Sequence, residues 1–381
     1  MRWGEEEGRP GVAGAERIGI AGAGAIAFAT AALLHENGHA PMLWSPSGGG
    51  TAALAAGEPL VATGAIGTSF APGVATTAAE LAAKNDTLLL ALPAYGHKPV
   101  MDALAPHIEA RHHVIISSHA SLGALYLGQR LAERGVSVPI TAWGTTVVTG
   151  RQTSPSEVRV NTVRQLIDLC TVPDTASEAE LALCERLFGE RFKPRDGLLA
   201  ISLSNLNPQN HMGIALGNMT RMDRGETWSQ GQNVTPKVGR LLEALDEERL
   251  AIARTLGLPV RTIFEHFHLS FHVPIASISE MNQDMHAQGN GGTGPATADS
   301  RYVTEDVPYG LALTVALGQL TGQPASLHEA GIQIFSAMYG RNFMAENALL
   351  NSISLSSYTL DDLKQAAHTG LLASRDAATV S

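Results

Sequence analysis

The sequence has few cysteines and no long apolar segment. Cys170 and Cys184 are the only cysteines in 381 residues, and their spacing fits neither a metal site nor a disulfide framework. We therefore expect a reduced, cytoplasmic setting. No run reaches the roughly 18 consecutive apolar residues that a membrane-spanning helix requires. Residues 1–15 lack the apolar core of a secretory signal, and we interpret them as a disordered extension.

Basic residues are also scarce. Lys and Arg number 26 against 36 Asp and Glu, which gives a net charge of −10. No basic cluster with interleaved aromatic residues is present, so we expect no nucleic-acid partner. The hydrophobic content of 44% is typical of a globular protein. A chain of this length exceeds what one compact core usually holds, which indicates two domains.

The clearest motif lies in residues 18–27, where a short apolar strand leads into Gly22-x-Gly24-x-x-Ala27. A strand, a glycine turn and a helix in this order are typical of dinucleotide binding, although a glycine-rich turn in an Ala/Gly-rich chain is the alternative. Gly22 permits a tight turn, and Gly24 lets a pyrophosphate approach the backbone and the helix N-terminus. The residues predicted to bind the cofactor here are Gly22, Gly24, Ala25, Ile26 and Ala27.

The end of the second predicted strand, residues 40–44, bears on the choice of cofactor. NAD-specific sites usually carry an acidic residue there, which binds the ribose 2′-hydroxyl. Here Ser45 and Ser47 follow the strand, so a 2′-phosphate would meet hydroxyl groups and no carboxylate. We therefore favour NADP(H) over NAD(H), although the usual arginine is absent and the turn could miss the ribose. Leu92 and Pro93, after a later strand, are also predicted to bind the cofactor.

Strand and helix patterns alternate between residues 16 and 195, which predicts a doubly wound α/β Rossmann domain. The expected strands are 17–21, 40–44, 87–92 and 113–117, the expected helices are 25–37, 77–84, 98–108 and 122–134, and segments 139–143 and 157–161 could add edge strands. Strand signals nearly vanish afterwards. We expect an all-helical domain over 196–368, with helices at 202–222, 235–256, 259–266, 305–320 and 324–338, and a flexible tail over 369–381.

Three segments of the helical half carry candidate chemistry. Residues 204–211 are densely polar ahead of an apolar helix, which suits either an N-cap or a site. Residues 301–310 likewise suit either a helix cap or a site, because Thr304 could cap a helix with acidic residues in its first turn. His268 and His272 share a helical face, but no nearby cysteine or acid completes a tetrahedral set, so we predict no metal site.

These motifs together resemble the opine dehydrogenases of the octopine/nopaline dehydrogenase family, over about residues 16–365. The resemblance rests on the glycine motif, Leu92-Pro93-Ala94-Tyr95-Gly96-His97, Asn207-Pro208-x-x-His211 and the Glu-Asp-Val-Pro-Tyr-Gly stretch within 301–310. It implies a Rossmann domain, then a helical domain, with substrates in the cleft between them. It also implies reduction, by a nicotinamide cofactor, of the imine formed from a 2-oxo acid such as pyruvate and an amino acid or amine.

The same resemblance implies roles for individual residues. His211 matches the catalytic histidine, and Asp306 matches the aspartate that orients it. Arg301 matches the arginine that holds the 2-oxo acid carboxylate. Asn207 is a candidate substrate contact, and His97 is either another or a cap of the next helix.

Some positions depart from the family pattern and leave the amine-binding wall open. Met212 stands where many relatives have proline, and Gln209 and Asn210 make this loop more polar. Candidates for the wall are Asn207, Asn210, Met222, Trp228 and His272. We expect a homodimer through apolar helices of the helical domain.

Two other functions compete with this interpretation. A ketopantoate-type or 2-oxo acid reductase would need no amine, but such enzymes typically use a lysine. Lys237, the only lysine between Lys193 and Lys364, has no substrate motif around it. A cofactor-binding sensor without catalysis would have little reason to carry His211, Arg301 and Asp306 together.

Overall fold

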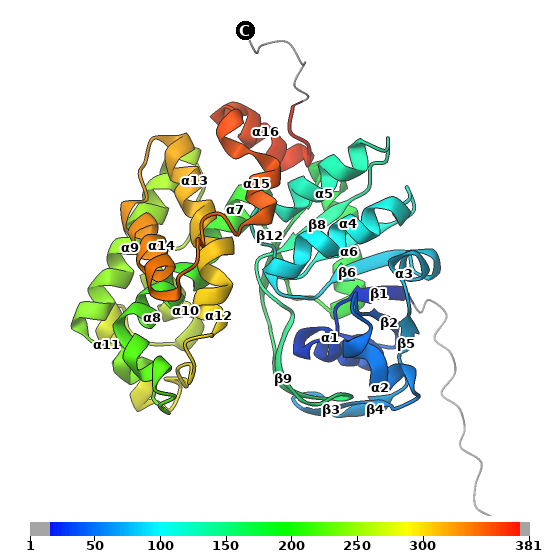
Figure 1. Cartoon of the computed structure of the whole chain (residues 1–381), viewed down its shortest axis with the longest axis horizontal. Helices are drawn as coiled ribbons and strands as arrows, with labels where there is room; N and C mark the ends of the chain where they lie inside the picture. Colours follow the sequence, from blue (N-terminus) through cyan, green and yellow to red (C-terminus); the bar gives the residue numbers. More distant parts are fainter. Residues whose placement is uncertain (1–15, 374–381) are drawn as a thin grey trace, which may run out of the picture.

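The computed structural model describes residues 16–373, and the predicted extension 1–15 and residues 374–381 lie outside that range. The chain folds into a sheet-based part up to Pro194 and a helical part from Gly197, which lie side by side (Figure 1). This confirms the predicted fold class. We retain the predicted domain limits, residues 16–195 and 196–368, as a proposal.

The first part is built on an eight-stranded sheet in the order β12-β11-β8-β7-β6-β1-β2-β5. Its strands pair in parallel, except that β11 runs antiparallel to β8. The strands are β1 (Arg17–Ala21), β2 (Ala40–Trp44), β5 (Gly73–Ala75), β6 (Thr87–Leu90), β7 (His113–Ile116), β8 (Ile140–Trp143), β11 (Ile167–Val172) and β12 (Phe192–Pro194). Helices α1 (Ala25–Glu36), α3 (Ala78–Lys84), α4 (His97–Leu104), α5 (Gly123–Ala132) and α6 (Ser177–Phe188) accompany it, with the short α2 (Ala52–Ala55).

Both faces of this sheet are buried, as β6 illustrates. Leu88 and Leu90 pack into the core that contains α3, α4 and α5, whereas Leu89 packs into the core that contains α1 and α6. Burial on both faces explains why the strand is an unbroken apolar run. The strand order reverses between β1 and β6, so the carboxyl ends of these two strands form the crevice where doubly wound sheets bind ligands.

A second sheet, in the order β4-β3-β10-β9, was not predicted. Its strands are β3 (Leu60–Gly64), β4 (Thr68–Phe70), β9 (Val148–Ser154) and β10 (Glu157–Val163), and it packs against α1. The suggestion that 157–161 adds an edge strand to the main sheet is therefore wrong, and 139–143 contains β8, an inner strand. Local alternation predicts a strand, but it cannot tell which sheet the strand joins.

Between residues 197 and 373 the structure contains helices and turns and no strand of a sheet. The helices are α7 (Gly197–Ser204), α8 (Asn207–Asp223), α9 (Pro236–Leu256), α10 (Ile263–Phe271), α11 (Ile278–Ala287), α12 (Arg301–Thr304), α13 (Ala312–Thr321), α14 (Ser326–Tyr339), α15 (Ala348–Ile353) and α16 (Leu360–Thr369). A π-helical turn, Val307–Leu311, precedes α13. Helix α15 packs back on α5, and α16 packs on α7 and β11 (Figure 1).

Three predicted helix boundaries are corrected by capping groups and breaks. The predicted helix 202–222 is two helices, α7 and α8, separated at residues 205–206. The predicted helix 259–266 begins later, because Thr262 caps α10 in a capping box with Glu265. Thr304 caps no helix: the Ser300 side chain caps α12, and the Thr304 hydroxyl donates to the Ser300 carbonyl over 3.1 Å.

Candidate active site

The glycine motif forms a cradle at the carboxyl end of β1. Gly22 has φ +145°, and a Cβ there would lie 2.2 Å from the Ala91 carbonyl oxygen, so only glycine fits the turn. A Cβ on Gly24 would meet nothing within 4 Å, and Gly24 precedes α1 without a side-chain cap. The helix begins with Ala25 and Ile26. Its first N–H groups are therefore free to bind a pyrophosphate. Buried Ala27 packs behind the turn.

The segment after β6 completes the cradle from the neighbouring strand. The Ala91 N–H donates to the Ala21 carbonyl over 2.9 Å, which places Leu92 and Pro93 beside the glycine turn. His97 is fully buried, and its Nε2 donates to the Leu92 carbonyl over 3.1 Å. Burial lowers its pKa to about 4, so the ring is neutral. His97 therefore supports this loop from behind and is not among the residues that line the pocket between the two parts of the chain.

The turn after β2 presents hydroxyl groups and no carboxylate. Ser45 is buried, and its Oγ lies 3.3 Å from the Oγ of Ser47. Gly48, with φ +71°, and Gly50 let the backbone bend closely here, since a Cβ on Gly50 would lie 2.7 Å from the Ala23 Cβ. Two hydroxyls and a small-residue turn suit a phosphate as well as a ribose hydroxyl.

His211 and Asp306 form a close pair in the helical part. Nδ1 of His211 lies 2.6 Å from Oδ2 of Asp306. The carboxylate can only accept, so Nδ1 carries the donated proton and Nε2 is the atom left for exchange. The imidazole also stacks on the Tyr302 ring, with centroids 3.6 Å apart and planes 9° apart. The Tyr302 hydroxyl in turn donates to Gln230 over 2.6 Å, so the imidazole is held on two sides.

Local packing explains why residues so distant in sequence meet. A Cβ on Gly310 would lie 2.3 Å from Cγ of Pro208, so glycine lets the start of α8 approach the π-helical turn. His211 lies one turn into α8, and Asp306 immediately precedes the π-helical turn. Pro208 suits the first turn of α8, where its missing N–H has no partner to lose. The Asn-Pro-x-x-His and Glu-Asp-Val-Pro-Tyr-Gly motifs thus build one site.

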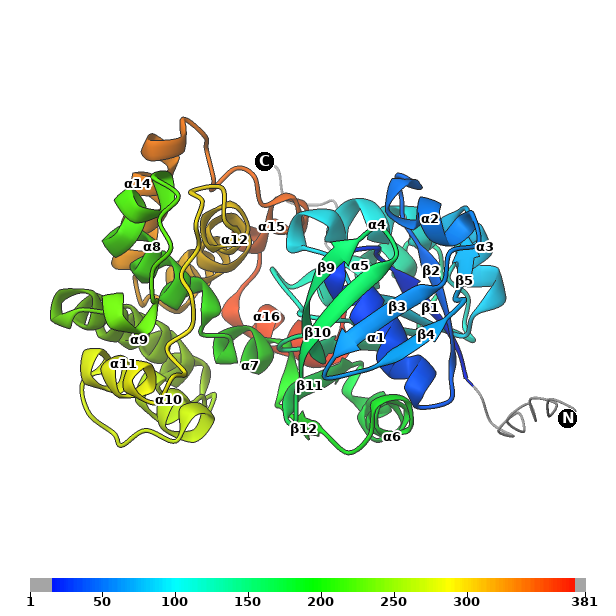
Figure 2. The same ribbon diagram turned by 90° about the horizontal axis from the view of Figure 1, so that it is seen from below.

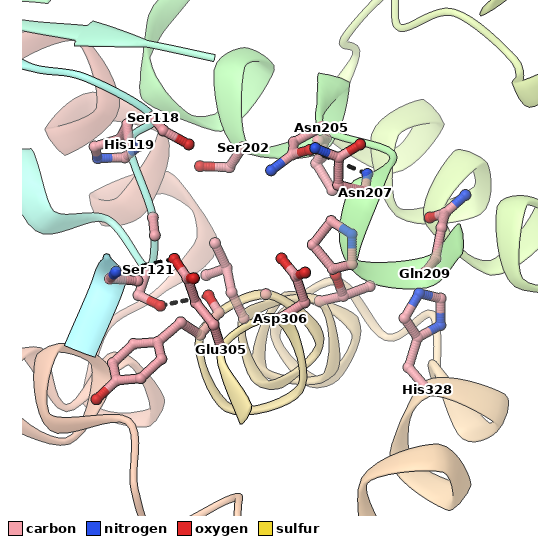
Figure 3. Close-up of a pocket in the computed structure, with 18 of the residues that line it drawn as sticks. Ser118, His119, Ser121, Ser202, Asn205, Asn207, Gln209, Glu305, Asp306 and His328 are labelled. Atoms are coloured by element: carbon pink, nitrogen blue, oxygen red, sulfur yellow. Dashed lines mark hydrogen bonds between the residues drawn. The ribbon is translucent and has the colours of Figure 1, made fainter. Parts of the chain in front are cut away.

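A pocket lies between the two parts of the chain beside this pair. Figure 3 shows the carboxylates of Glu305 and Asp306 extending into the space between Ser121 on one side and Asn207 on the other. From the sheet-based part the lining residues are Ala94, Ser118, His119, Ala120 and Ser121. From the helical part they include Ser202, Asn205, Asn207, Pro208, Gln209, Arg301, Glu305, Asp306, Tyr309, Leu313, Thr314 and His328.

Glu305 and Arg301 both line this pocket. Oε1 of Glu305 accepts the Ala94 N–H over 3.0 Å, which ties the loop after β6 to the helical part. Burial raises the pKa of Glu305. Nε of Arg301 lies 4.0 Å from Oε2 of Glu305, and 58% of the Arg301 side chain is exposed. Because Arg301 has no closer ion-pair partner in residues 16–373, it is available to an anionic substrate.

Comparisons with known proteins agree with this arrangement. Residues 194–339 match the family described as "NAD/NADP octopine/nopaline dehydrogenase, alpha-helical domain", and residues 18–168 match "Ketopantoate reductase PanE/ApbA". The chain is 30% identical to an opine dehydrogenase of Arthrobacter sp. (strain 1C) over 308 residues, which cover 80% of this chain and 84% of that protein. The chain belongs to the opine dehydrogenase family. It is an NAD(P)-dependent oxidoreductase acting on CH–NH bonds.

Solved structures of the opine dehydrogenase group share the fold. An octopine dehydrogenase solved with NADH and L-arginine superposes with a TM-score of 0.76 at 16% identity, covering 92% of this chain and 98% of that one. A yersinopine dehydrogenase solved with NADP⁺ gives a TM-score of 0.68 at 17% identity, covering 93% and 98%. At these identities the likeness concerns the arrangement of the two domains.

The sequence did not predict one part of this opine dehydrogenase site, the loop 118–122 after β7. Three of its non-glycine residues, Ser118, Ser121 and Leu122, have φ between 49° and 62°. The Ser121 hydroxyl donates to the Tyr309 carbonyl over 2.6 Å, and the Asn347 amide donates to Ser121 over 2.9 Å. Strained backbone of this kind persists where the surroundings hold it and is common at functional sites. The available signal in the sequence was that this loop follows a predicted strand, which places it at the carboxyl edge of the sheet.

His119 in the same loop lines the pocket and is also neutral. Its Nε2 accepts the Ala124 N–H over 3.2 Å, so Nδ1 carries the proton, and that atom has no hydrogen-bond partner among residues 16–373. Burial lowers its pKa to about 3, with a smaller contribution from His97. A buried donor without a partner in a pocket wall is a position where a substrate oxygen would be satisfied.

The structure separates the candidates for the amine-binding wall. Asn207 lines the pocket, whereas Asn210, Met222, Trp228 and His272 do not. Met222 is a core residue, and the Trp228 indole donates to the Pro295 carbonyl over 2.9 Å. His268 likewise uses Nδ1 on the Val273 carbonyl. Among residues 16–373, no group of three or more His, Cys, Asp or Glu side chains is placed to hold a metal ion.

Proposed function

We propose that this enzyme condenses a 2-oxo acid with an amino acid or amine and reduces the resulting imine, with His211 and Asp306 as its catalytic pair. The observation that carries the proposal is the 2.6 Å contact between these two side chains, because Asp306 lines a pocket that Arg301 also lines. Octopine dehydrogenase, which shares the fold, has been solved with NADH and, in separate structures, with pyruvate, L-arginine and agmatine, which supports the proposed substrate classes.

In this proposal each residue has one task. Arg301 holds the carboxylate of the 2-oxo acid, and Asn207 contacts the substrate at the opposite wall. His211 exchanges a proton at Nε2 while Asp306 keeps Nδ1 protonated and fixes the ring. Condensation forms the C=N bond and releases water, and the chemistry that a nicotinamide held at the glycine turn would supply is the hydride that reduces the former carbonyl carbon. The product is a secondary amine, with the nitrogen keeping one proton.

Cofactor binding is assigned to the glycine turn and its neighbours. Gly22, Gly24, Ala25, Ile26 and Ala27 would hold the pyrophosphate, and Leu92 and Pro93 would lie against the rest of the cofactor. For Ser45 and Ser47 we propose contact with a 2′-phosphate, and hence a preference for NADP(H) over NAD(H). The absence of a carboxylate in this turn supports the preference.

The alternative of a ketopantoate-type reductase is not favoured. The model of that family matches residues 18–168, in the sheet-based part, whereas the helical part matches the octopine/nopaline dehydrogenase family. Lys237, the lysine that such an enzyme would use, is exposed at the start of α9 and does not line the pocket. The pocket instead contains Arg301 and Asp306, which suit the amine-dependent reaction.

Two broader features also belong to the proposal. Leu327, Ile334 and Met338 leave exposed apolar side chains along α14, which supports a homodimer through the helical domain. Cys170 and Cys184 are buried free thiols, and burial raises the pKa of Cys184 to about 12. Unoxidised cysteines support a cytoplasmic location. No helix in residues 16–373 is long and apolar enough to cross a membrane.

The test is an absorbance assay of nicotinamide oxidation, run in parallel with NADPH and NADH. The purified enzyme receives a pool of 2-oxo acids, with or without a pool of amino acids and small amines. Oxidation that requires both pools supports the proposal, and omission of single compounds then identifies the pair. Oxidation with the 2-oxo acids alone would assign the enzyme to the amine-independent reductases.

A further inference from the structure

The carboxylate of Glu305 lies where three parts of the site meet. Its Oε1 accepts the Ala94 N–H over 3.0 Å, which places it beside the loop after β6 that we assign to the cofactor. Its Oε2 lies 4.0 Å from Nε of Arg301, the arginine proposed to hold the 2-oxo acid. The next residue, Asp306, contacts His211 over 2.6 Å. In the proposed complex the carboxylate on Arg301 is bonded directly to the reacting carbonyl carbon, so Glu305 lies close to that carbon.

One oxygen of this carboxylate is free. Oε1 is used by the backbone N–H, whereas Oε2 forms no hydrogen bond with any residue in the range 16–373. The Glu305 side chain is 19% exposed, and Figure 3 shows its carboxylate extending into the pocket. Oε2 is therefore a hydrogen-bond acceptor that a ligand in the pocket can reach.

The other groups of the pocket wall that could exchange a proton are already engaged or lie elsewhere. Nε2 of His119 accepts a backbone N–H, and burial lowers the pKa of that ring to about 3. The Tyr309 hydroxyl donates to a backbone carbonyl over 3.2 Å. His328 contacts a neighbouring glutamate through Nδ1, and in Figure 3 Asp306 lies between it and Glu305. Glu305 is thus the carboxylate in this wall with an oxygen open to a substrate.

The condensation needs a second group of this kind beside His211. An amine reaches the pocket as an ammonium ion, but only the unprotonated amine can attack a carbonyl. On the way to a protonated imine the nitrogen loses two protons, and the carbonyl oxygen gains two and leaves as water. His211 has a single nitrogen, Nε2, available for exchange, so a second side chain is needed to hold the other proton.

We propose that Glu305 is the general base that takes the first proton from the bound ammonium group and later returns it to the leaving oxygen. This rests on the proposed function. Once Oε2 has accepted the proton, the nitrogen electron pair forms the C–N bond and the carbonyl π pair moves to oxygen. His211 then carries the second proton from nitrogen to oxygen at Nε2, and Glu305 returns the first. The C–O bond breaks, water leaves, and the nitrogen pair forms C=N, with both side chains back in their starting states.

The surroundings of Glu305 suit a base for this proton. Burial has the largest effect on the pKa of its carboxyl group and raises it, and the charge of Asp306 acts in the same direction. The charges of Arg301 and His211 and the Ala94 N–H lower it, but by less in sum. A carboxylate with a raised pKa is a stronger base than one in water, and burial between two domains limits competition from solvent.

The first experiment uses Glu305→Gln, whose amide oxygen can still accept the Ala94 N–H but cannot take a proton. We measure kcat/KM for the amine at saturating 2-oxo acid, from neutral pH up to the pKa of the amine. Glu178→Gln is the matched control, since Glu178 is exposed on α6 and has no ion pair among residues 16–373. Cofactor titration checks that each variant keeps the wild-type cofactor Kd.

Wild type and Glu178→Gln should give a level profile, because the enzyme deprotonates the bound ammonium ion. Glu305→Gln should be about 100-fold slower at neutral pH. Its kcat/KM should rise about tenfold per pH unit, because it depends on free amine already present in solution. A profile for Glu305→Gln that runs parallel to that of the wild type, or an unchanged rate at neutral pH, would overturn the proposal.

The second experiment bypasses condensation. The cyclic imine 1-pyrroline-2-carboxylate already contains the C=N bond and a carboxylate on its carbon, so its reduction needs no base for an ammonium ion. Glu305→Gln should reduce it at the wild-type rate. A loss as large as in the condensation would show that Glu305 only supports the structure of the site, and would overturn the proposal. Cofactor oxidation by the wild type with a 2-oxo acid and no amine would instead contradict the proposed function.

Discussion

Nδ1 of His211 lies 2.6 Å from Oδ2 of Asp306, although 95 positions separate the two residues in the sequence. The contact depends on the π-helical turn and on Gly310, which lets Pro208 approach. It leaves Nε2 as the free ring nitrogen of His211.

Replacement of His211 should abolish proton exchange without loosening the cofactor. For His211→Ala we expect kcat to fall about 100- to 10,000-fold, the usual contribution of a positioned acid–base group. The cofactor Kd should stay near the wild-type value, because the glycine cradle lies in the other domain. Steady-state kinetics and cofactor titration check this, with exposed His107→Ala as the control. Retained turnover would remove His211 from the acid–base role.

Replacement of Arg301 should act on one substrate. In Arg301→Gln the KM of the 2-oxo acid should rise roughly 10- to 100-fold, because the carboxylate loses a charged bidentate partner. The cofactor Kd should change little. Initial rates at varied 2-oxo acid and fixed amine give the answer. An unchanged KM would show that another residue holds this carboxylate.

The turn after β2 should decide between the two cofactors. Ser45→Asp places a carboxylate where we propose the 2′-phosphate, and like charges repel. The ratio of kcat/KM for NADPH to that for NADH should fall by about tenfold or more. Ser47→Asp is the matched variant two residues further along the same turn. If neither substitution moves the ratio, this turn does not contact the ribose.

The buried neutral His97 should make the fold sensitive to acid. Its pKa is 6.5 as a free group and about 4 in the folded protein, because burial disfavours the charged ring. Above pH 6.5 the ring is neutral in both the folded and the unfolded state, so His97 takes nothing from the free energy of unfolding. As the pH falls toward 4, only the unfolded state binds the proton, and the free energy of unfolding decreases. The loss amounts to at most about 3 kcal/mol.

Urea denaturation of the wild type and His97→Gln at pH 6.5 and near pH 4 measures this effect. Glutamine can still donate to the Leu92 carbonyl but does not titrate. The variant should therefore lose less unfolding free energy between the two pH values than the wild type and the exposed control His107→Gln. Equal losses in all three proteins would contradict the assignment of the acid sensitivity to His97.

The sequence predicted the central strands well because their pattern is local. The strands Arg17–Ala21 and Ala40–Trp44 have the predicted limits, since each is an apolar run that ends at a turn residue. The second sheet was missed because β10 pairs with β3 across almost a hundred residues, and such pairing leaves no local signal. The sequence predicted that the second domain is all helical, but it did not identify every capping residue. Thr304 was the candidate cap, whereas Ser300 caps α12.

The residues of the site also divide into those that a local motif predicts and those that depend on contacts between distant segments. The glycine cradle follows from a motif of ten residues and the physics of close backbone approach. His211 and Asp306 were paired only through the family resemblance, because nothing in their spacing says that they meet. Glu305 was missed, since its significance lies in a contact between the two parts of the chain, where its carboxylate accepts the Ala94 N–H.

The central claim is that hydride reaches an imine carbon, and an isotope experiment tests it most directly. The enzyme is supplied with NADPH deuterated at the transferred position, a 2-oxo acid and an amino acid, and the products are analysed by mass spectrometry. We predict a secondary amine that carries one deuterium on the carbon derived from the 2-oxo acid. Deuterium found instead in a 2-hydroxy acid, with the amino acid unchanged, would contradict the account.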